Sequence, residues 1–311
     1  MQTVLITGGT GLVGKALTKQ LIDKGYNIII LTRNKDEIPK NKTQIPTITY
    51  TIWNVEKKLI DVEAVQKADH IIHLAGAGVM DKRWNAAYKN IIQQSRIKSS
   101  ELLVDVLKNN PNNVQTVVSA SAIGWYGPDI IPGKMFVETD PADKSFLGET
   151  CRLWEESIAP VSQLGKRLVK LRTGIVLSND GGAFPEFKKS LKFGVASILG
   201  NGRQMISWIH IDDLCRLYIA AIENNDLNGS YNAVASQPVN NKELTLMAAR
   251  KSKAFFIPIH VPSFVLKIVL GEQSIEVLKS TTVSCEKIKQ AGFQFLYPSI
   301  DSAISELSIA E

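Results

Sequence analysis

The 311-residue sequence has only three cysteines, and Cys151, Cys215 and Cys285 lie far apart. No Cys-x-x-Cys pair is present and the four histidines show no metal-ligand spacing, which argues against a metal site or a disulfide framework. Charge interrupts the longest apolar stretches, as Lys267 does within residues 261–270, so we expect no membrane partner. Lys and Arg give a net charge of +6 but form no basic run, which argues against nucleic-acid binding. A strand-like start is not typical of a signal peptide, and we expect a cytoplasmic protein.

What the sequence does contain is a glycine motif at its start. The apolar run Val4–Ile6 leads into Gly8, Gly11 and Gly14, and a helical pattern follows over residues 15–23. Such a turn between strand and helix binds diphosphate, because backbone N–H groups and the helix dipole both favour an anion there. Gly8 allows the turn, Gly11 allows the pyrophosphate to approach, and Gly14 allows close packing. We therefore predict a dinucleotide site formed by Gly8, Thr10, Gly11, Leu12, Val13 and Gly14.

Short apolar runs alternate with helical patterns through the first half of the chain, which is typical of a parallel sheet with crossover helices. The expected strands are residues 3–7, 27–32, 47–53, 70–75, 114–120 and 167–172. The expected helices are residues 11–24, 61–66, 84–109, 146–164 and, near the end, 261–270. We predict an α/β fold, a Rossmann-type doubly wound parallel sheet with a smaller C-terminal α/β substrate region. The assigned ranges are residues 1–175 with parts of 200–235 for the dinucleotide-binding domain, and 176–311, including a C-terminal module over about 255–305, for the substrate side.

The end of the second expected strand indicates which cofactor the site prefers. A NAD-selective site usually places Asp or Glu there to accept from the ribose hydroxyls, but this chain has Thr32 and Arg33. Arg33 cannot accept from a hydroxyl, whereas its guanidinium can bind a 2′-phosphate bidentately. The alternative is a solvated loop arginine. We therefore place Thr32 and Arg33 at the cofactor and favour NADP(H) over NAD(H).

Three further segments complete the expected cofactor site. Asn54 follows the third strand, where a polar side chain can meet the adenine edge. The stretch Leu74-Ala75-Gly76 ends the fourth strand and lets the backbone approach the nicotinamide ribose, unless it serves only helix-on-sheet packing. Arg96 lies among apolar residues of the next helix, so its guanidinium needs a partner. That partner is either the dinucleotide or an internal carboxylate such as Glu155.

Several segments in order along the chain carry a family resemblance: Thr7–Gly14, Leu74–Ala77, Ser119–Ser121, and Gly200–Arg203 with Trp208–Asp213. They resemble the glycine motif, the fourth-strand motif, the serine strand and the late substrate-side motif of the extended (atypical) short-chain dehydrogenase/reductase superfamily. This superfamily includes sugar-nucleotide epimerases and dehydratases, and the resemblance covers nearly the whole chain.

A narrower resemblance rests on further segments: Asp81–Trp84, Ser95-Arg96, Ser121–Gly127, Arg172–Gly174 and parts of Val261–Pro298. These are similar to the poorly characterised subfamily labelled nucleoside-diphosphate-sugar epimerase, which has its own C-terminal domain. Membership implies NADP binding more directly than it implies a substrate.

The resemblance breaks at the catalytic pair. The superfamily uses Tyr-x-x-x-Lys after the serine strand, where the lysine lowers the tyrosine's pKa and the tyrosine moves a proton during hydride transfer. Here the corresponding residues are Phe146 with Thr150 or Leu147 with Cys151, and neither pair can act as acid and base in that way. Cys151 has no histidine motif beside it, which favours a buried structural thiol over a nucleophile.

Two residues are candidates for the missing chemistry. Ser121 is retained and can hold a substrate hydroxyl or carbonyl, or else it caps the end of its own strand. Tyr126 lies five residues further along, in a glycine-flanked loop, and is the leading candidate for proton transfer. An unactivated tyrosine, with a pKa of about 10, is a poor base at neutral pH, so packing is the alternative role.

On the substrate side, Arg203, Trp208 and His210 form the most suggestive group. Arginine recognises diphosphate bidentately, and tryptophan offers a flat face to a nucleobase or sugar. His210 can instead cap the helix that follows. Lys82, after the fourth strand, can contact an anionic substrate or lie in a solvated loop.

Two functions from different classes remain open. The first is an NADP-dependent oxidoreductase or epimerase-like enzyme for a small-molecule substrate such as a sugar nucleotide, working without the Tyr/Lys pair. The alternative is a catalytically silent NADP(H)-binding regulatory or scaffold protein, which the retained Ser121 argues against. The helices expected at 84–109 and 146–164 can pair in a homodimer, and we expect Pro160 to kink the second.

Overall fold

Strands and helices alternate through the first half of the chain as the sequence pattern predicts. The computed structural model describes residues 1–38, 48–252 and 255–309. Its strands are β1 (Thr3–Thr7), β2 (Asn27–Thr32), β3 (Ile48–Ile52), β4 (His70–His73), β5 (Thr116–Ala122), β6 (Arg167–Thr173), β7 (Ile175–Leu177), β8 (Val195–Leu199), β9 (Met205–Ile206), β10 (Trp208–His210), β11 (Gly229–Ala233), β12 (Val239–Asn240) and β13 (Ile257–Val261). Its α-helices are α1 (Leu12–Asp23), α2 (Val62–Gln66), α3 (Ala86–Asn109), α4 (Phe146–Ile158), α5 (Phe184–Leu191), α6 (Ile211–Glu223), α7 (Asn241–Lys251), α8 (Ser263–Leu270), α9 (Ser274–Leu278), α10 (Glu286–Gln290) and α11 (Ile300–Ile309). Short 3₁₀ helices are η1 (Lys35–Glu37), η2 (Ile123–Trp125), η3 (Ala159–Leu164) and η4 (Gly271–Gln273).

Seven parallel strands form the central sheet, in the order β11-β6-β5-β4-β1-β2-β3. The chain runs outward from β1 to β3 and then crosses back to β4, so the strand order reverses between β1 and β4. At β1 the last residue, Thr7, is in register with Leu31 and His73, which brings three strand ends to one edge. Ligands of such sheets bind at that edge, beside the reversal. The predicted Rossmann-type doubly wound α/β fold is confirmed.

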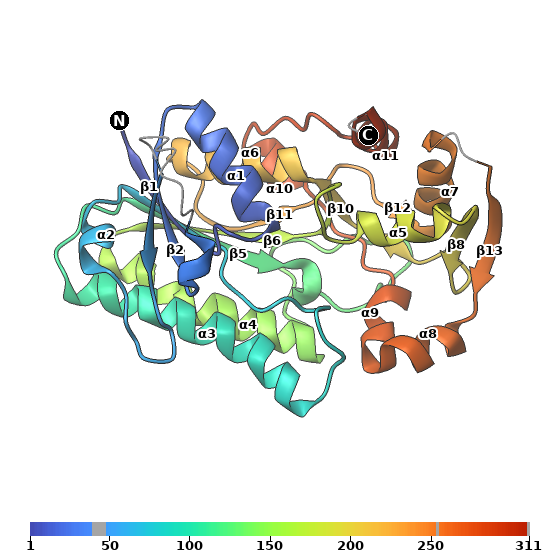
Figure 1. Ribbon diagram of the computed structural model, residues 1–311, viewed down its shortest axis with the longest axis horizontal. Helices are drawn as coiled ribbons and strands as arrows, with labels where there is room; N and C mark the ends of the chain where they lie inside the picture. The colour runs from blue at the N-terminus through green and yellow to red at the C-terminus, as the bar shows by residue number, and fades with distance from the viewer. Residues whose placement is uncertain (39–47, 253–254, 310–311) are drawn as a thin grey trace.

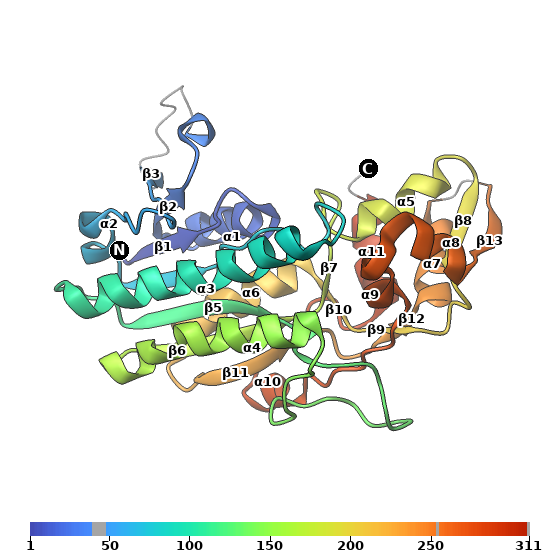
Figure 2. The ribbon, with the colours of Figure 1, turned by 90° about the horizontal axis from the view of Figure 1, so that it is seen from below.

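Both faces of the sheet are covered by helices (Figure 1). Helices α1, α6 and α10 lie on one face and α2, α3 and α4 on the other. Viewed from below, α3 and α4 run side by side (Figure 2). Neighbouring strand residues point to opposite faces, so Ile71 and Ile72, both 0% exposed, belong to two different cores. Because both faces of the sheet are buried, the sequences of its strands are continuous apolar runs.

The second half of the chain contributes to two parts of the molecule. Helix α6 and strand β11 complete the central sheet and its cover. Three two-stranded pairs, β10 with β7, β12 with β9, and β13 with β8, build a smaller region together with α5, α7 and α11. Phe184, Trp208 and Ile304 lie in its core. None of the described helices combines the length and apolar character needed to cross a membrane.

The helix expected from residue 84 begins at Ala86, after its N-cap Asn85. Two other expected helices have different bounds because of a proline. The helix expected over residues 146–164 does not kink at Pro160; α4 ends at Ile158 and continues as the 3₁₀ helix η3. Proline has no N–H to donate into the preceding turn, and its ring clashes with the carbonyl four residues before. The helix expected from residue 261 begins only at Ser263, because Pro262 is its N-cap and Val261 ends β13.

Shortening a side chain in the sheet core tests this packing. Ile72→Ala should lower the free energy of unfolding by about 2–5 kcal/mol, because Ile72 is 0% exposed and the cavity cannot be filled by water. Ile130→Ala changes a side chain that is 83% exposed and should cost no more than about 0.5 kcal/mol. Urea unfolding followed by tryptophan fluorescence measures both. Equal losses in the two variants would contradict the assigned core.

Candidate functional site

The loop between β1 and α1 has the shape that a diphosphate needs. Gly8 has φ +70°, a left-handed conformation that favours glycine. A Cβ on Gly14 would overlap the carbonyl oxygen of Gly8, so no larger residue fits there. Gly11 is the N-cap of α1 and provides no capping side chain, and the first turn carries no acidic residue. The first N–H groups of α1, at Leu12 and Val13, are therefore suited to an anion.

The residues expected at the adenosine end lie at the ends of β2 and β3. Arg33 follows β2 directly and is exposed, while Thr32 is buried and its hydroxyl accepts from the N–H of Asn34 at 3.2 Å. The side-chain oxygen of Asn54 accepts from the N–H of Lys57 at 2.9 Å. That oxygen therefore fixes its own turn, and the amide nitrogen of Asn54 remains for an adenine.

A buried hydroxyl ties the glycine loop to the end of β4. The Thr7 hydroxyl accepts from the N–H groups of Leu74 and Ala75, each at 3.2 Å, and lies 2.7 Å from Nδ1 of His73. Because the Thr7 hydroxyl accepts from both of these N–H groups, its own proton is left to donate to the imidazole. Nδ1 of His73 is therefore the acceptor, and Nε2 carries the ring hydrogen. Nε2 lies 3.2 Å from the hydroxyl of Ser100. Sequence reasoning missed this pair, although a histidine that ends a buried strand is a signal for it.

Arg96 lies against Gly76 and Ala77, in the loop that follows β4. Its Nη1 donates to the carbonyls of Ala77 at 3.0 Å and Ile92 at 2.8 Å, and its guanidinium lies 5.0 Å from the ring centre of Trp154. A Cβ on Gly76 would come within 3.1 Å of its Cζ, so the glycine lets the loop pass closely over the guanidinium. The expectation that Glu155 could be the partner of Arg96 is wrong, because the carboxylate of Glu155 pairs with Arg172.

Both catalytic candidates lie in a buried polar network at the ends of β5, β6 and β11. Ser121 donates to Glu155 at 2.8 Å, and Arg172 Nε donates to the same carboxylate at 2.8 Å. The Tyr126 hydroxyl donates to Asn232 at 2.7 Å and accepts from Arg172 at 3.0 Å. All five side chains are at most 4% exposed. Burial raises the pKa of Tyr126 to about 12, so the structure makes it a still poorer base than the sequence predicts.

The start of α4 favours Leu147 with Cys151 over Phe146 with Thr150 as the pair beside the end of β5. A Cβ on Gly124, in η2 just after β5, would lie 3.3 Å from Leu147 and 3.6 Å from the sulfur of Cys151, so these two residues flank the strand end. Phe146 instead packs edge-on against Trp84. Burial raises the pKa of Cys151 to about 12, which keeps it a thiol. Neither Leu147 nor Cys151 can exchange a proton at neutral pH.

The substrate-side predictions separate into buried and exposed residues. Trp208 is 0% exposed and its ring nitrogen donates to the carbonyl of Gln237, so the prediction of a flat face for a sugar or base is wrong. His210 is also buried, and its Nδ1 accepts from the N–H of Asp212, which makes it the N-cap of α6. Arg203 and Lys82 are exposed, as a contact with an anionic substrate requires.

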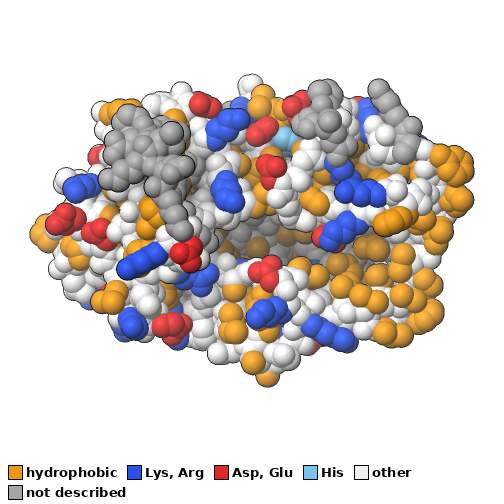
Figure 3. Space-filling model, in the orientation of Figure 1, with side chains coloured by type: hydrophobic (Ala, Val, Ile, Leu, Met, Phe, Trp, Pro, Cys, Tyr) orange, Lys and Arg blue, Asp and Glu red, His pale blue; other side chains and the backbone are white. Residues whose placement is uncertain are grey.

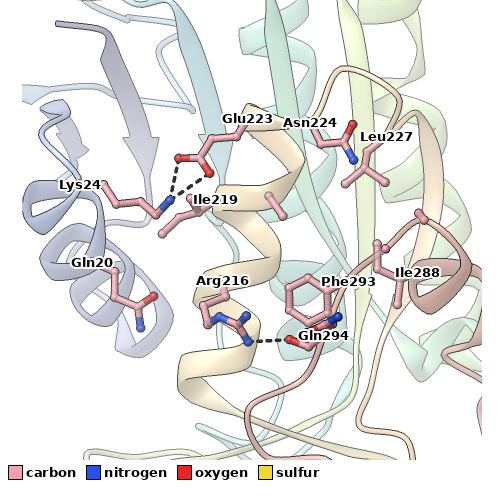
Figure 4. A pocket seen from close by; sticks show the side chains of 13 residues that line it. Gln20, Lys24, Arg216, Ile219, Glu223, Asn224, Leu227, Ile288, Phe293 and Gln294 are labelled. Carbon is pink, nitrogen blue, oxygen red and sulfur yellow. Dashed lines mark hydrogen bonds and ion pairs between the residues drawn. The ribbon is translucent and has the colours of Figure 1, made fainter.

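The molecular surface is hollowed between the sheet and the smaller region, near the carboxyl edge of the sheet (Figure 3). A separate groove of about 400 Å³ lies between α1, α6 and the segment after α10 (Figure 4). Its cations are already engaged, because Lys24 pairs with Glu223 at 2.9 Å and Arg216 donates to the carbonyl of Gln294 at 2.8 Å. Lys24 follows the last residue of α1, about 18 Å from the glycine loop. This groove is therefore not the cofactor site.

The fold and the glycine loop define an α/β protein of the Rossmann type. Residues 4–153 match the model of the NAD dependent epimerase/dehydratase family, and residues 261–307 match a domain of unknown function, DUF1731. Epimerase family proteins of Staphylococcus saprophyticus and Staphylococcus aureus are each 36% identical to the chain, over 99% of both partners. The chain belongs to this epimerase/dehydratase family of extended short-chain dehydrogenases/reductases, with the DUF1731 domain at its C-terminal end.

Solved structures show the same relationship. The human epimerase family protein SDR39U1 (isoform 2), determined with NADPH, superimposes with a TM-score of 0.87 at 26% identity, over 100% of both chains. The nucleoside-diphosphate sugar epimerase from Corynebacterium glutamicum superimposes with a TM-score of 0.77 at 32% identity, over 99% of this chain and 58% of that one.

The buried His73 predicts an acid sensitivity of this site. Burial, with a smaller effect of nearby Arg96, lowers the pKa of His73 to about 3, whereas an unfolded chain has about 6.5. Between these values the unfolded chain binds a proton that the folded protein does not. His73 therefore lowers the free energy of unfolding as the pH falls below about 6.5, by up to about 1.4 kcal/mol per pH unit.

Urea unfolding from about pH 7 to about pH 4 measures this slope. We expect His73→Asn to have a shallower loss of stability with falling pH than the unmodified protein. His260→Asn, which replaces an exposed histidine, should keep the original slope. Identical slopes in all three proteins would contradict a buried neutral His73.

Proposed function

We propose that the chain binds NADP(H) and acts as an oxidoreductase or epimerase-like enzyme on a small-molecule substrate such as a sugar nucleotide. The observation that carries the cofactor is the glycine loop, where Gly14 leaves no space for a side chain and α1 presents uncapped N–H groups. Arg33 at the end of β2, in place of a carboxylate, favours the 2′-phosphate of NADP(H). The human relative determined with NADPH supports the same cofactor.

Each part of the site has a role in this proposal. The glycine loop would hold the diphosphate, Arg33 the 2′-phosphate, and Leu74–Gly76 the nicotinamide ribose. When bound, the nicotinamide supplies hydride transfer, and the protein contributes binding and orientation. Arg203 and Lys82, both exposed, can attract the phosphates of a sugar nucleotide.

The proton that accompanies hydride transfer needs another source than the usual tyrosine. Leu147 and Cys151 replace the catalytic pair, and Ser121 and Tyr126 already bond to buried partners. We propose that water or a substrate hydroxyl supplies the proton, and that Ser121 and Tyr126 hold the ends of β5, β6 and β11 together.

The closed network also favours a second function, a catalytically silent NADP(H)-binding regulatory or scaffold protein. A native mass spectrum of freshly purified, undialysed protein distinguishes the two. Bound NADP(H) together with a second small molecule is expected for the enzyme and would identify the substrate class. NADP(H) with no second molecule, and no turnover on a panel of sugar nucleotides, would favour the scaffold. A failure to bind even added NADPH would overturn both.

Arg33 provides the test of cofactor preference. Arg33→Ala should weaken NADPH binding by about 1–3 kcal/mol, roughly 5- to 150-fold in Kd, because the charged hydrogen bonds to the 2′-phosphate are lost. NADH binding should stay nearly unchanged. Titration of cofactor fluorescence measures both, and Lys35→Ala, two residues further along, is the matched control that should bind NADPH normally. Equal weakening for NADPH and NADH would refute the role of Arg33.

A further inference from the structure

We infer that the C-terminal module acts as a clasp on the loop between β4 and α3, and so couples occupancy of the cofactor site to the module. The clasp consists of the end of α8 and of η4, residues 268–273, together with loop residues 77–85 and Lys89 of α3. This inference rests on the proposed cofactor binding. The clasp gives a role to the C-terminal domain, whose family model describes it as a domain of unknown function.

Gln273 is the centre of the clasp. It is 3% exposed, and its amide nitrogen donates to the loop carbonyls of Val79 at 3.2 Å and Lys82 at 2.9 Å. The carbonyl of Val79 also accepts from the ring nitrogen of Trp84 at 2.9 Å. Because a buried amide without partners is costly, Gln273 favours the one loop conformation that presents both carbonyls to it.

Charged groups extend the contact on either side of Gln273. Arg83 donates to the carbonyl of Ile268 at 3.3 Å, in the last turn of α8, where the helix dipole favours a cation. A Cβ on Gly271 would lie 2.8 Å from Nε of Arg83, so only glycine lets the guanidinium approach the chain this closely. Lys89, near the start of α3, pairs with Glu272. The clasp therefore joins segments about 190 residues apart through hydrogen bonds, an ion pair and close packing.

The same loop begins inside the cofactor site. Thr7 accepts from the N–H groups of Leu74 and Ala75, and a Cβ on Gly8 would lie 3.0 Å from the nitrogen of Ala75. Ala77 follows, with its N–H bonded to Ser95 at 3.0 Å and its carbonyl to Arg96. Contacts are therefore continuous from the glycine loop through residues 74–85 to η4. If the clasp is more stable in one arrangement of Leu74–Gly76, a ligand that favours this arrangement also favours the clasp, because coupling between sites is reciprocal.

Hydrogen exchange of the full chain, measured by mass spectrometry with and without NADPH, tests the inference. NADPH should slow exchange in the glycine loop, residues 8–14, and also in residues 262–279 of the module. Gln273→Ala should keep the NADPH-dependent slowing at 8–14 and lose it at 262–279. The comparison uses the change on adding NADPH, so a general loosening of the module in the variant does not imitate the result.

Gln204→Ala is the matched control. Gln204 is also buried, and its amide nitrogen donates to two carbonyls, those of Leu199 and Val277, neither of which belongs to the β4–α3 loop. This variant should transmit the NADPH effect to residues 262–279 as the unmodified protein does.

Each outcome decides a different point. Slowing at residues 8–14 with no change at 262–279 in the unmodified protein overturns the clasp and leaves cofactor binding intact. Undiminished transmission in Gln273→Ala overturns the role of Gln273 in it. Absence of NADPH-dependent slowing at both places overturns the proposed cofactor and the coupling together. Hydrogen exchange of the unmodified protein with and without NADPH needs no variant. The inference can therefore be refuted even if Gln273→Ala folds poorly.

Discussion

The position of β1 between β2 and β4 is the constraint on which the site depends. It aligns Thr7 with Leu31 and His73, so the glycine loop, Arg33 and Leu74–Gly76 all start from one edge. A slip by one residue would exchange the side chains of β1 between the two cores and separate Thr7 from its imidazole. The hydrogen bond between them, 2.7 Å long and shielded from water, fixes this register where the cofactor site begins.

The fold could be predicted largely from local pattern. Strands β1 and β2 have the bounds that their apolar runs indicate, because a strand buried on both faces leaves little room for polar residues. The end of α4 was not predictable from amphipathic spacing, which continues past Pro160 although the hydrogen bond there is lost. Local periodicity thus identifies elements better than it identifies their ends.

The site could be predicted where its residues are contiguous, and not where they meet across the sheet. The glycine loop is a single stretch, so spacing alone identifies it. The partner of Glu155 is Arg172 rather than Arg96, and only the paired ends of β5 and β6 decide between them. Trp208 shows the same limit, because a tryptophan that offers its face to a ligand and one that fills a core have the same local sequence.

The pairing of β13 with β8 has a consequence for solubility. Ile257 and Ile259 are about half exposed on β13, which among the described residues pairs with β8 alone. Its other edge is a template for joining another chain. The N–H of Ile257 points toward β8 and donates to the carbonyl of Gly194, just before that strand, so position 258 has its nitrogen on the free side. That position is Pro258, which has no hydrogen to offer. Pro258 therefore removes one of the N–H donors on the free side of this apolar strand, which disfavours strand addition there.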